Sequence, residues 1–302
     1  MSESGSFDGL FQRAVAAIDE GDASNLRNLL ERHPALASER LELPGSWLRQ
    51  QAGSALDGFF RQPYLLWFIA EDPARQGALP ANITELADII IQAARRAKTP
   101  HLQEQLDSTL RLVCWSGVAA KAGVQLDLID VLIDAGALPA ENANNALVNG
   151  HAGAAEHLIG RGATLTLAAA LCLERWEDLP RLESQANQEQ RQFAFVLAAL
   201  NGKAEALRWM IQAGIDVNRP SPDLYSHGTP LHHAVCSGSL DAVKALVSAG
   251  ADVHMPDSAW NATALGWAEH YEQNAPAEQV AKYAAVAAYL RDQARARSAA
   301  EF

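Results

Sequence analysis

The sequence predicts an all-α protein made of helix pairs that stack side by side, and three observations support this fold class. A block of residues recurs along the chain, apolar residues within it follow helical spacing, and no strand-rich stretch competes with that pattern. A single helix pair cannot bury its apolar stripe, so each pair needs neighbours. We therefore expect about eight pairs, of which the last is 263–271 with 277–295, and we expect the final segment, 277–302, to be a long helix that caps the array.

The N-terminal half is expected to hold three pairs and one insertion. The expected pairs lie at 7–34, at 63–70 with 82–97, and at 102–116 with 126–135. Residues 38–62 fall outside the pattern and include Trp47, Phe59 and Phe60, which are too apolar for a free linker. We favour an insertion that folds back over the first repeats, and the alternative is that it forms part of a recognition surface.

The clearest block is 229–253, TPLHHAVCSGSLDAVKALVSAGADV. Thr229 is a good N-cap, and Pro230 suits the first helical position, where a missing N–H costs nothing. Gly238 suits a left-handed helix end, and apolar residues at helical spacing follow it as far as Gly250. The start of the block returns as TALGWA at 263–268, so the same unit is expected there.

This block resembles the ankyrin repeat, in which a TPLHxA helix start leads through a glycine turn to a second helix and a GADV-like end. The resemblance is strong at 229–253 and weaker elsewhere; a different all-α solenoid is the alternative. It implies one solenoid over 1–302, with a first repeat and insertion at 7–62, degenerate repeats at 63–217, and the best-matching repeats and cap at 218–302.

The middle repeats are expected to lack the projecting finger loop of the family. The closing glycines Gly136 and Gly162 stand too close together for two helices and a finger. A degenerate repeat is expected at 166–187, where two short helices fit. The resemblance thus confines the finger loops to the C-terminal repeats.

The resemblance implies a protein–protein interaction scaffold, because ankyrin repeats commonly bind partners through finger tips and first helices that line a concave groove. Carried over to this chain, the expected contact residues are Tyr225, His233, Ser237, Trp260, Trp267, His270 and Tyr271. Trp and Tyr dominate interface energetics. We favour an interface role for Trp260 and a packing role for Trp267, while His232 matches the structural histidine of the TPLH start.

The composition of the chain indicates which class of partner it is expected to bind. Lys and Arg total 24 against 36 Asp and Glu, a formal net charge of −12, which argues against nucleic acid and fits a partner with a basic surface, such as a protein that this chain inhibits. No apolar run is long enough to span a membrane. The polar start is not a secretory signal, and three cysteines do not make a disulfide framework, so a cytoplasmic protein is expected.

No catalytic, nucleotide-binding or metal-binding motif is recognisable, so we expect no enzyme, no cofactor and no metal. His151, Glu156 and His157 lack the HExxH spacing and fit a solvated helix face. When the repeats are aligned, Cys114, Cys172 and Cys236 fall in different repeats, too far apart to form a disulfide or share a metal. We therefore expect all three to be reduced thiols. The alternative is a small-molecule site or enzyme with a pocket in the N-terminal or middle repeats, near Trp47, Phe60 or Trp115.

Overall fold

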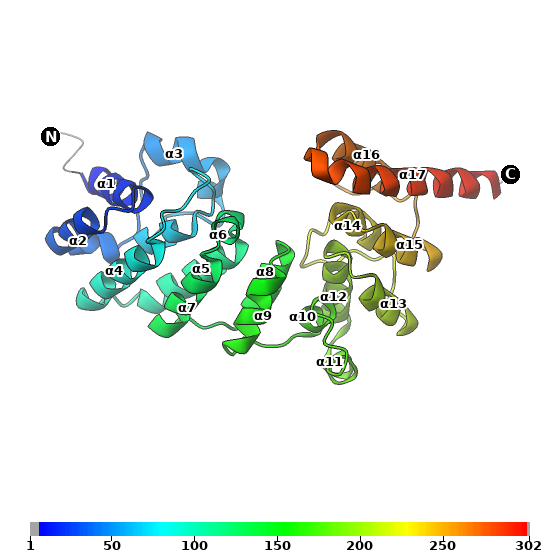
Figure 1. Ribbon diagram of the computed structural model, residues 1–302, viewed down its shortest axis with the longest axis horizontal. Coiled ribbons are helices and arrows are strands. Elements are labelled where there is room, and N and C mark those ends of the chain that lie inside the picture. The colour runs from blue at the N-terminus through cyan, green and yellow to red at the C-terminus, as the bar shows by residue number, and fades with distance from the viewer. Residues whose placement is uncertain (1–5, 301–302) are drawn as a thin grey trace. The chain divides into compact units, whose positions relative to one another are not determined.

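The computed structural model describes residues 6–300, with side chains as far as Arg297, and this part of the chain is all-α. It contains two isolated β-bridges, Ser221 with Leu224 and Pro256 with Thr263, and no β-strand. The chain divides into two compact units, residues 1–164 and 165–302, and each is described by itself (Figure 1). The predicted fold class is therefore confirmed.

Unit 1 holds nine α-helices and three short 3-10 helices among its described residues. They are α1 (Phe7–Asp19), α2 (Ala23–Arg32), η2 (Pro34–Ala37), α3 (Ser46–Ala52), η3 (Gly53–Asp57), η4 (Leu65–Ala70), α4 (Ile83–Arg96), α5 (Leu102–Trp115), α6 (Gly117–Ala122), α7 (Gln125–Ala135), α8 (Asn142–Val148) and α9 (Ala152–Gly160). Ser6 and Asp22 cap the first two α-helices, since their side chains accept the N–H groups of Gly9 and Asn25.

Unit 2 holds the remaining helices. They are α10 (Leu167–Cys172), α11 (Leu179–Gln185), α12 (Gln188–Leu200), α13 (Ala204–Gln212), α14 (Pro230–Ser237), α15 (Leu240–Ser248), α16 (Ala264–Asn274) and α17 (Ala277–Ala300). The degenerate repeat expected at 166–187 is present as α10 and α11, and the expected C-terminal helix is α17.

The helices pair and stack as the repeat pattern predicts. The eight pairs in the described residues are α1/α2, η4/α4, α5/α7, α8/α9, α10/α11, α12/α13, α14/α15 and α16/α17. Within unit 1, α5 contacts η4 and α8, while α4 contacts α2 and α7; within unit 2, α12 contacts α10 and α14, and α15 contacts α13 and α17. Each helix pair therefore buries its apolar stripe against its neighbours.

The stretch expected as a helix at 63–70 is a 3-10 helix, η4, and this is the clearest local departure in unit 1. All six of its side chains are buried, including Trp67 and Phe68, so the segment has no polar face. Glu71 ends it in a left-handed conformation at φ +50°. Its carboxylate pairs with the buried Arg75, which also bonds to Asp19 of α1 at 2.8 and 3.0 Å.

The insertion at 38–62 folds back onto unit 1, as we favoured. Phe60 is buried against Phe68, with ring centroids 5.2 Å apart. The Trp47 indole N–H donates to Asp8 of α1 at 3.0 Å. Phe59 remains half-exposed and contacts Trp115 edge-on. The insertion thus packs against the first repeats instead of forming a free linker.

Loop lengths confirm that the middle repeats lack fingers. Only Ala186 and Asn187 connect α11 to α12, and the connections after α7 and α9 are short turns in which Gly136 and Gly162 adopt positive φ. By contrast, long segments at 213–229 and 249–263 precede α14 and α16. The two finger loops therefore flank the best-matching repeat.

The thiols of unit 1 and unit 2 are free, as expected from the alignment of repeats. Cys114 and Cys172 are fully buried, and burial raises the pKa of each thiol to about 12. Cys236 is partly buried, and its sulfur lies 3.3 Å from the Tyr271 hydroxyl. These residues serve as small packing side chains.

Candidate partner-binding surface

The finger loop before α16 is organised by one buried carboxylate, Asp257. Its Oδ1 accepts the backbone N–H groups of Ala259 at 2.8 Å and Trp260 at 2.6 Å. Its Oδ2 accepts the N–H of Ala262 at 3.1 Å and the indole N–H of Trp267 at 2.9 Å. Burial alone would raise the pKa of Asp257, but these donors outweigh it and lower the pKa to about 2. The loop is therefore held in its conformation by hydrogen bonds within the chain itself.

The two tryptophans whose N–H groups Asp257 accepts, Trp260 and Trp267, differ in how exposed their rings are. Trp260 is 68% exposed at the loop tip, whereas Trp267 lies on α16 and is half-buried. The two rings pack edge-on with centroids 5.7 Å apart. An exposed indole on a loop that is already fixed would lose little entropy if another molecule covered it.

Two side chains of the preceding finger extend the same surface. The His227 ring contacts Trp260 edge-on at 5.1 Å and Trp267 at 5.8 Å. Tyr225 is 49% exposed and lies 6.3 Å from His227. The backbone N–H of Ser258 donates to the His227 carbonyl at 2.9 Å, which links the two fingers directly. We call Tyr225, His227, Trp260 and Trp267 the aromatic surface.

His232 joins the fingers from below and has the structural role expected for it. The Thr229 backbone N–H donates to its Nδ1 at 3.2 Å, and its Nε2 lies 3.1 Å from the Ala262 carbonyl. An acceptor at Nδ1 fixes the tautomer with the proton on Nε2. Burial lowers the pKa of His232, so the ring stays neutral in this arrangement.

His233 lies beneath the aromatic surface. It is 2% exposed, and its ring contacts Tyr225 at 6.1 Å and Trp267 at 6.3 Å. Burial, together with the neighbouring His232 and His227 rings, lowers the pKa of His233 to about 4. Its burial means that it supports the surface rings and does not itself face solvent, although the sequence pattern places it among the contact residues.

Ser237, His270 and Tyr271 lie at the C-terminal ends of α14 and α16. The Ser237 hydroxyl donates to the Ala234 carbonyl at 2.6 Å. Tyr271 stacks on Tyr283 of α17 at 5.0 Å, so it is held between the last two helices. His270 is exposed beside Asn274. No ring contact joins these three to the aromatic surface within the described residues, and their contribution to binding stays a prediction.

Sequence reasoning missed His227 and Asp257. His227 precedes the recognisable TPLH start by two positions, where no pattern singles out a residue. Asp257 could have been found, because Asp followed by small residues in a turn typically accepts backbone N–H groups two or three positions later. The segment DSAWNAT has that form.

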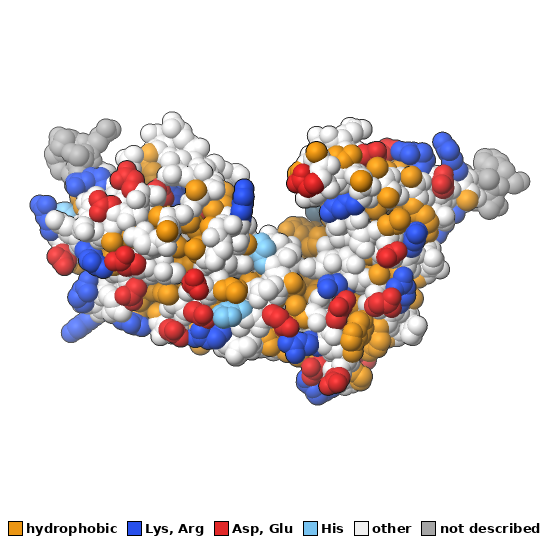
Figure 2. Space-filling model, in the orientation of Figure 1, with side chains coloured by type: hydrophobic (Ala, Val, Ile, Leu, Met, Phe, Trp, Pro, Cys, Tyr) orange, Lys and Arg blue, Asp and Glu red, His pale blue; other side chains and the backbone are white. Residues whose placement is uncertain are grey.

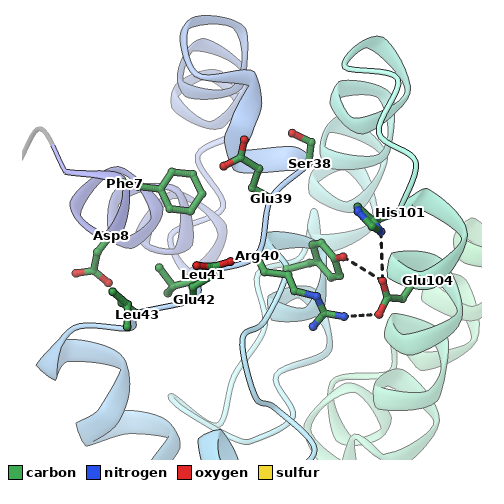
Figure 3. A pocket seen from close by; sticks show the side chains of 11 residues that line it. Phe7, Asp8, Ser38, Glu39, Arg40, Leu41, Glu42, Leu43, His101 and Glu104 are labelled. Carbon is green, nitrogen blue, oxygen red and sulfur yellow. Dashed lines mark hydrogen bonds and ion pairs between the residues drawn. The ribbon is translucent and has the colours of Figure 1, made fainter.

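Unit 1 contains an open cleft of about 670 Å³ between the start of α1, the segment 38–43 and the start of α5 (Figure 3). Glu104 anchors one end: its carboxylate forms an ion pair with Arg40 and accepts the Tyr64 hydroxyl at 3.1 Å. His101 Nδ1 lies 3.7 Å from the same carboxylate. The cleft is in the N-terminal region where a pocket was the alternative expectation, but Trp47, Phe60 and Trp115 do not line it.

The described residues offer neither a metal site nor a membrane-spanning helix. No group of three or more His, Cys, Asp or Glu side chains is arranged to hold a metal ion. In the helix that begins at Ala152, His157 instead lies 2.7 Å from Asp130 of α7. No described helix combines the length and apolar character that crossing a membrane requires.

Comparison with known proteins identifies the repeats. Residues 117–257, just under half of the chain, match the family model described as ankyrin repeats (3 copies). No curated protein matches the sequence. Among solved structures, the chain is similar to the human ASB11 ankyrin repeat domain at 18% identity and a TM-score of 0.33, covering 67% of this chain and 92% of that one. Residues 117–257 therefore carry the repeat pattern that this family model describes.

Proposed function

We propose that this chain is a non-enzymatic scaffold that binds a partner protein through the aromatic surface. Ankyrin repeats are generally protein-interaction modules, and the observation that carries the proposal is Trp260, which is 68% exposed on a loop fixed by four hydrogen bonds to Asp257. A tryptophan held out in solvent by a buried carboxylate contributes little to the core. Its exposure is best explained by a partner that covers it.

The partner is proposed to present a basic surface. The chain carries a formal charge of −12, and on the face drawn in Figure 2 acidic and basic side chains of the described residues intermingle without a large basic area. The absence of a large basic area on that face disfavours binding to a nucleic acid backbone. The net negative charge would steer a positively charged protein toward the chain. Three free thiols fit the reducing cytoplasm, which we propose as its compartment.

Replacing Trp260 with Ala tests the proposal. The variant should keep its melting temperature within a few degrees, because the ring is mostly exposed, and should lose about tenfold or more in partner affinity, as expected for an aromatic anchor. The partner is first obtained by affinity purification from the native host and mass spectrometry. Binding is then measured by calorimetry with the purified partner.

Trp176→Ala is the matched control, because Trp176 is also exposed in unit 2, at 43%, but lies on the connection between α10 and α11. It should bind the partner as the parent chain does. Equal binding by parent and Trp260→Ala would refute the surface, and a large loss of stability in Trp260→Ala would show that the ring packs instead.

A further inference from the structure

The cleft of unit 1 has an unequal distribution of charge. Four carboxylates line it, from Asp8, Glu39, Glu42 and Glu104, against the single guanidinium of Arg40. Figure 3 shows Glu104 with Arg40 and His101 at one end, while Asp8, Glu42 and Leu43 lie toward the other. The two ends differ in whether their charges are compensated.

At the end of the cleft that holds Arg40, the charge of the guanidinium is already compensated. The guanidinium is paired with Glu104, donates to the Gln62 carbonyl at 3.0 Å, and lies 4.4 Å from the centroid of the buried Tyr64 ring. Burial and the bond to Glu104 raise the pKa of Tyr64, which keeps the phenol neutral. This end therefore has no uncompensated positive charge that would attract an anion, and its side chains are held in place by these contacts.

The opposite end keeps its negative charge. The carboxylates of Glu39 and Glu42 are exposed, and neither forms an ion pair or hydrogen bond with any residue that the structure describes. Asp8 uses Oδ1 to accept the N–H of Gly45 at 2.9 Å and the indole N–H of Trp47 at 3.0 Å, and its position is fixed by those two donors. A cation entering the cleft would meet carboxylates that no side chain between residues 6 and 297 neutralises.

The same end also offers apolar contact. Leu43 is 82% exposed, and Phe7 of α1, which also lines the cleft, is partly exposed. An arginine or lysine side chain matches this combination, because its methylene stem covers apolar surface while its charged head reaches a carboxylate. An inorganic cation would leave the apolar wall uncovered.

We propose that this cleft binds an arginine or lysine side chain carried by an extended segment of a protein. The cleft is open to solvent rather than enclosed, so a free small molecule could not bury most of its surface there. A peptide can run along an open cleft and still place one charged side chain inside it. The site lies in unit 1, and the proposal holds or fails independently of the aromatic surface in unit 2.

The probe is a capped hexapeptide with two arginines among alanine and leucine residues, compared with the same peptide carrying citrulline, which keeps shape but lacks charge. Binding to the full chain is followed by NMR of the tryptophan indole N–H signals. The Trp47 signal, identified by Trp47→Phe, should shift because this indole bonds to Asp8, and the Trp260 signal should not. The citrulline peptide should bind at least about fivefold more weakly.

The variant Glu39→Gln with Glu42→Gln should weaken arginine-peptide binding by roughly fivefold to tenfold at low salt, while Glu20→Gln with Glu31→Gln, two exposed acids of unit 1 outside the cleft, should not. The melting temperatures of both double variants should equal that of the parent chain, which would show that the replacements leave the fold intact. Equal binding by both double variants, equal binding of the citrulline peptide, or an undisturbed Trp47 signal would each overturn the proposal.

Discussion

Asp257 is a buried carboxylate whose hydrogen bonds all come from N–H groups of one loop and one helix. Such a group stabilises its surroundings only while it is charged and has two acceptor oxygens. Because the donors lower its pKa to about 2, its contribution is complete above the unfolded value of 3.8 and is lost as the pH falls through about 2. At neutral pH the finger is therefore at its most ordered.

Replacing Asp257 with Asn should destabilise the C-terminal repeats by about 2 kcal/mol, because one accepting oxygen becomes an N–H₂ group facing donors. Denaturant unfolding followed by tryptophan fluorescence measures the loss. Asp223→Asn, at an exposed position of the other finger, should change stability by less than about 0.5 kcal/mol. A similar effect of the two variants would show that the Asp257 bonds contribute nothing particular.

His233 makes the same region sensitive to mild acid. Its pKa falls from the usual 6.5 to about 4 in the folded chain, so the unfolded chain binds the proton more readily. The stability that comes from burying the neutral ring is present above pH 6.5 and declines as the pH falls toward 4. At about pH 5 the loss should be on the order of 1–2 kcal/mol.

The variant His233→Phe keeps a ring in place and removes the proton. Between pH 7 and 5 its melting temperature should fall by several degrees less than that of the parent, and the difference isolates His233 from His232, whose pKa shifts in the same direction. Thermal unfolding by circular dichroism across this range is the measurement. Parallel curves would mean that His233 does not govern the acid response.

Among the elements, α14 is the one in which sequence and structure agree most closely. Pro230 occupies its first turn, Gly238 ends it at φ +69°, and Thr229 forms a capping box with His232. Each of these features follows from local chemistry, so the sequence alone was sufficient. The segment 65–70 shows the opposite case, since its uniformly apolar residues carry no periodicity from which α- and 3-10 helix could be told apart.

Thr229→Ala should cost about 1 kcal/mol by removing the side chain from this capping box. Urea unfolding of the full chain, monitored by far-ultraviolet circular dichroism, would detect it. Ser226→Ala, an exposed hydroxyl three positions earlier, is the control and should be neutral. An unchanged midpoint for Thr229→Ala would place the helix start elsewhere.

For the whole chain, the sequence predicted the all-α repeat architecture because periodicity and turn glycines are local signals. It also placed Trp260 in a finger loop and Trp267 in the helix that follows, where the structure has them. The lining of the unit 1 cleft escaped prediction because it comes from α1, the segment 38–43 and the start of α5, which only folding brings together. Asp257 differs, because its donors lie in the same loop and the next helix and the loop sequence has the form of such a turn.

The net charge of −12 makes a further prediction about the chain as a whole. If the partner is basic, its association rate should fall several-fold when NaCl is raised from about 0.05 to about 0.5 M, because the Debye length shrinks below the distance over which steering operates. Stopped-flow fluorescence or surface plasmon resonance would measure this. A rate that does not change with salt would assign recognition to the aromatic surface alone.

The way Asp257 holds residues 259–262 has a practical consequence for engineering. Three of its four bonds are to backbone N–H groups, which every amino acid except proline supplies, so apart from Asn261, whose φ of +54° favours Asn or Gly, they depend little on which side chains follow. Randomised sequences could replace the loop tip while Asp257 and Trp267 are retained. The finger would then serve as a grafting position at which new specificities are selected on an unaltered scaffold.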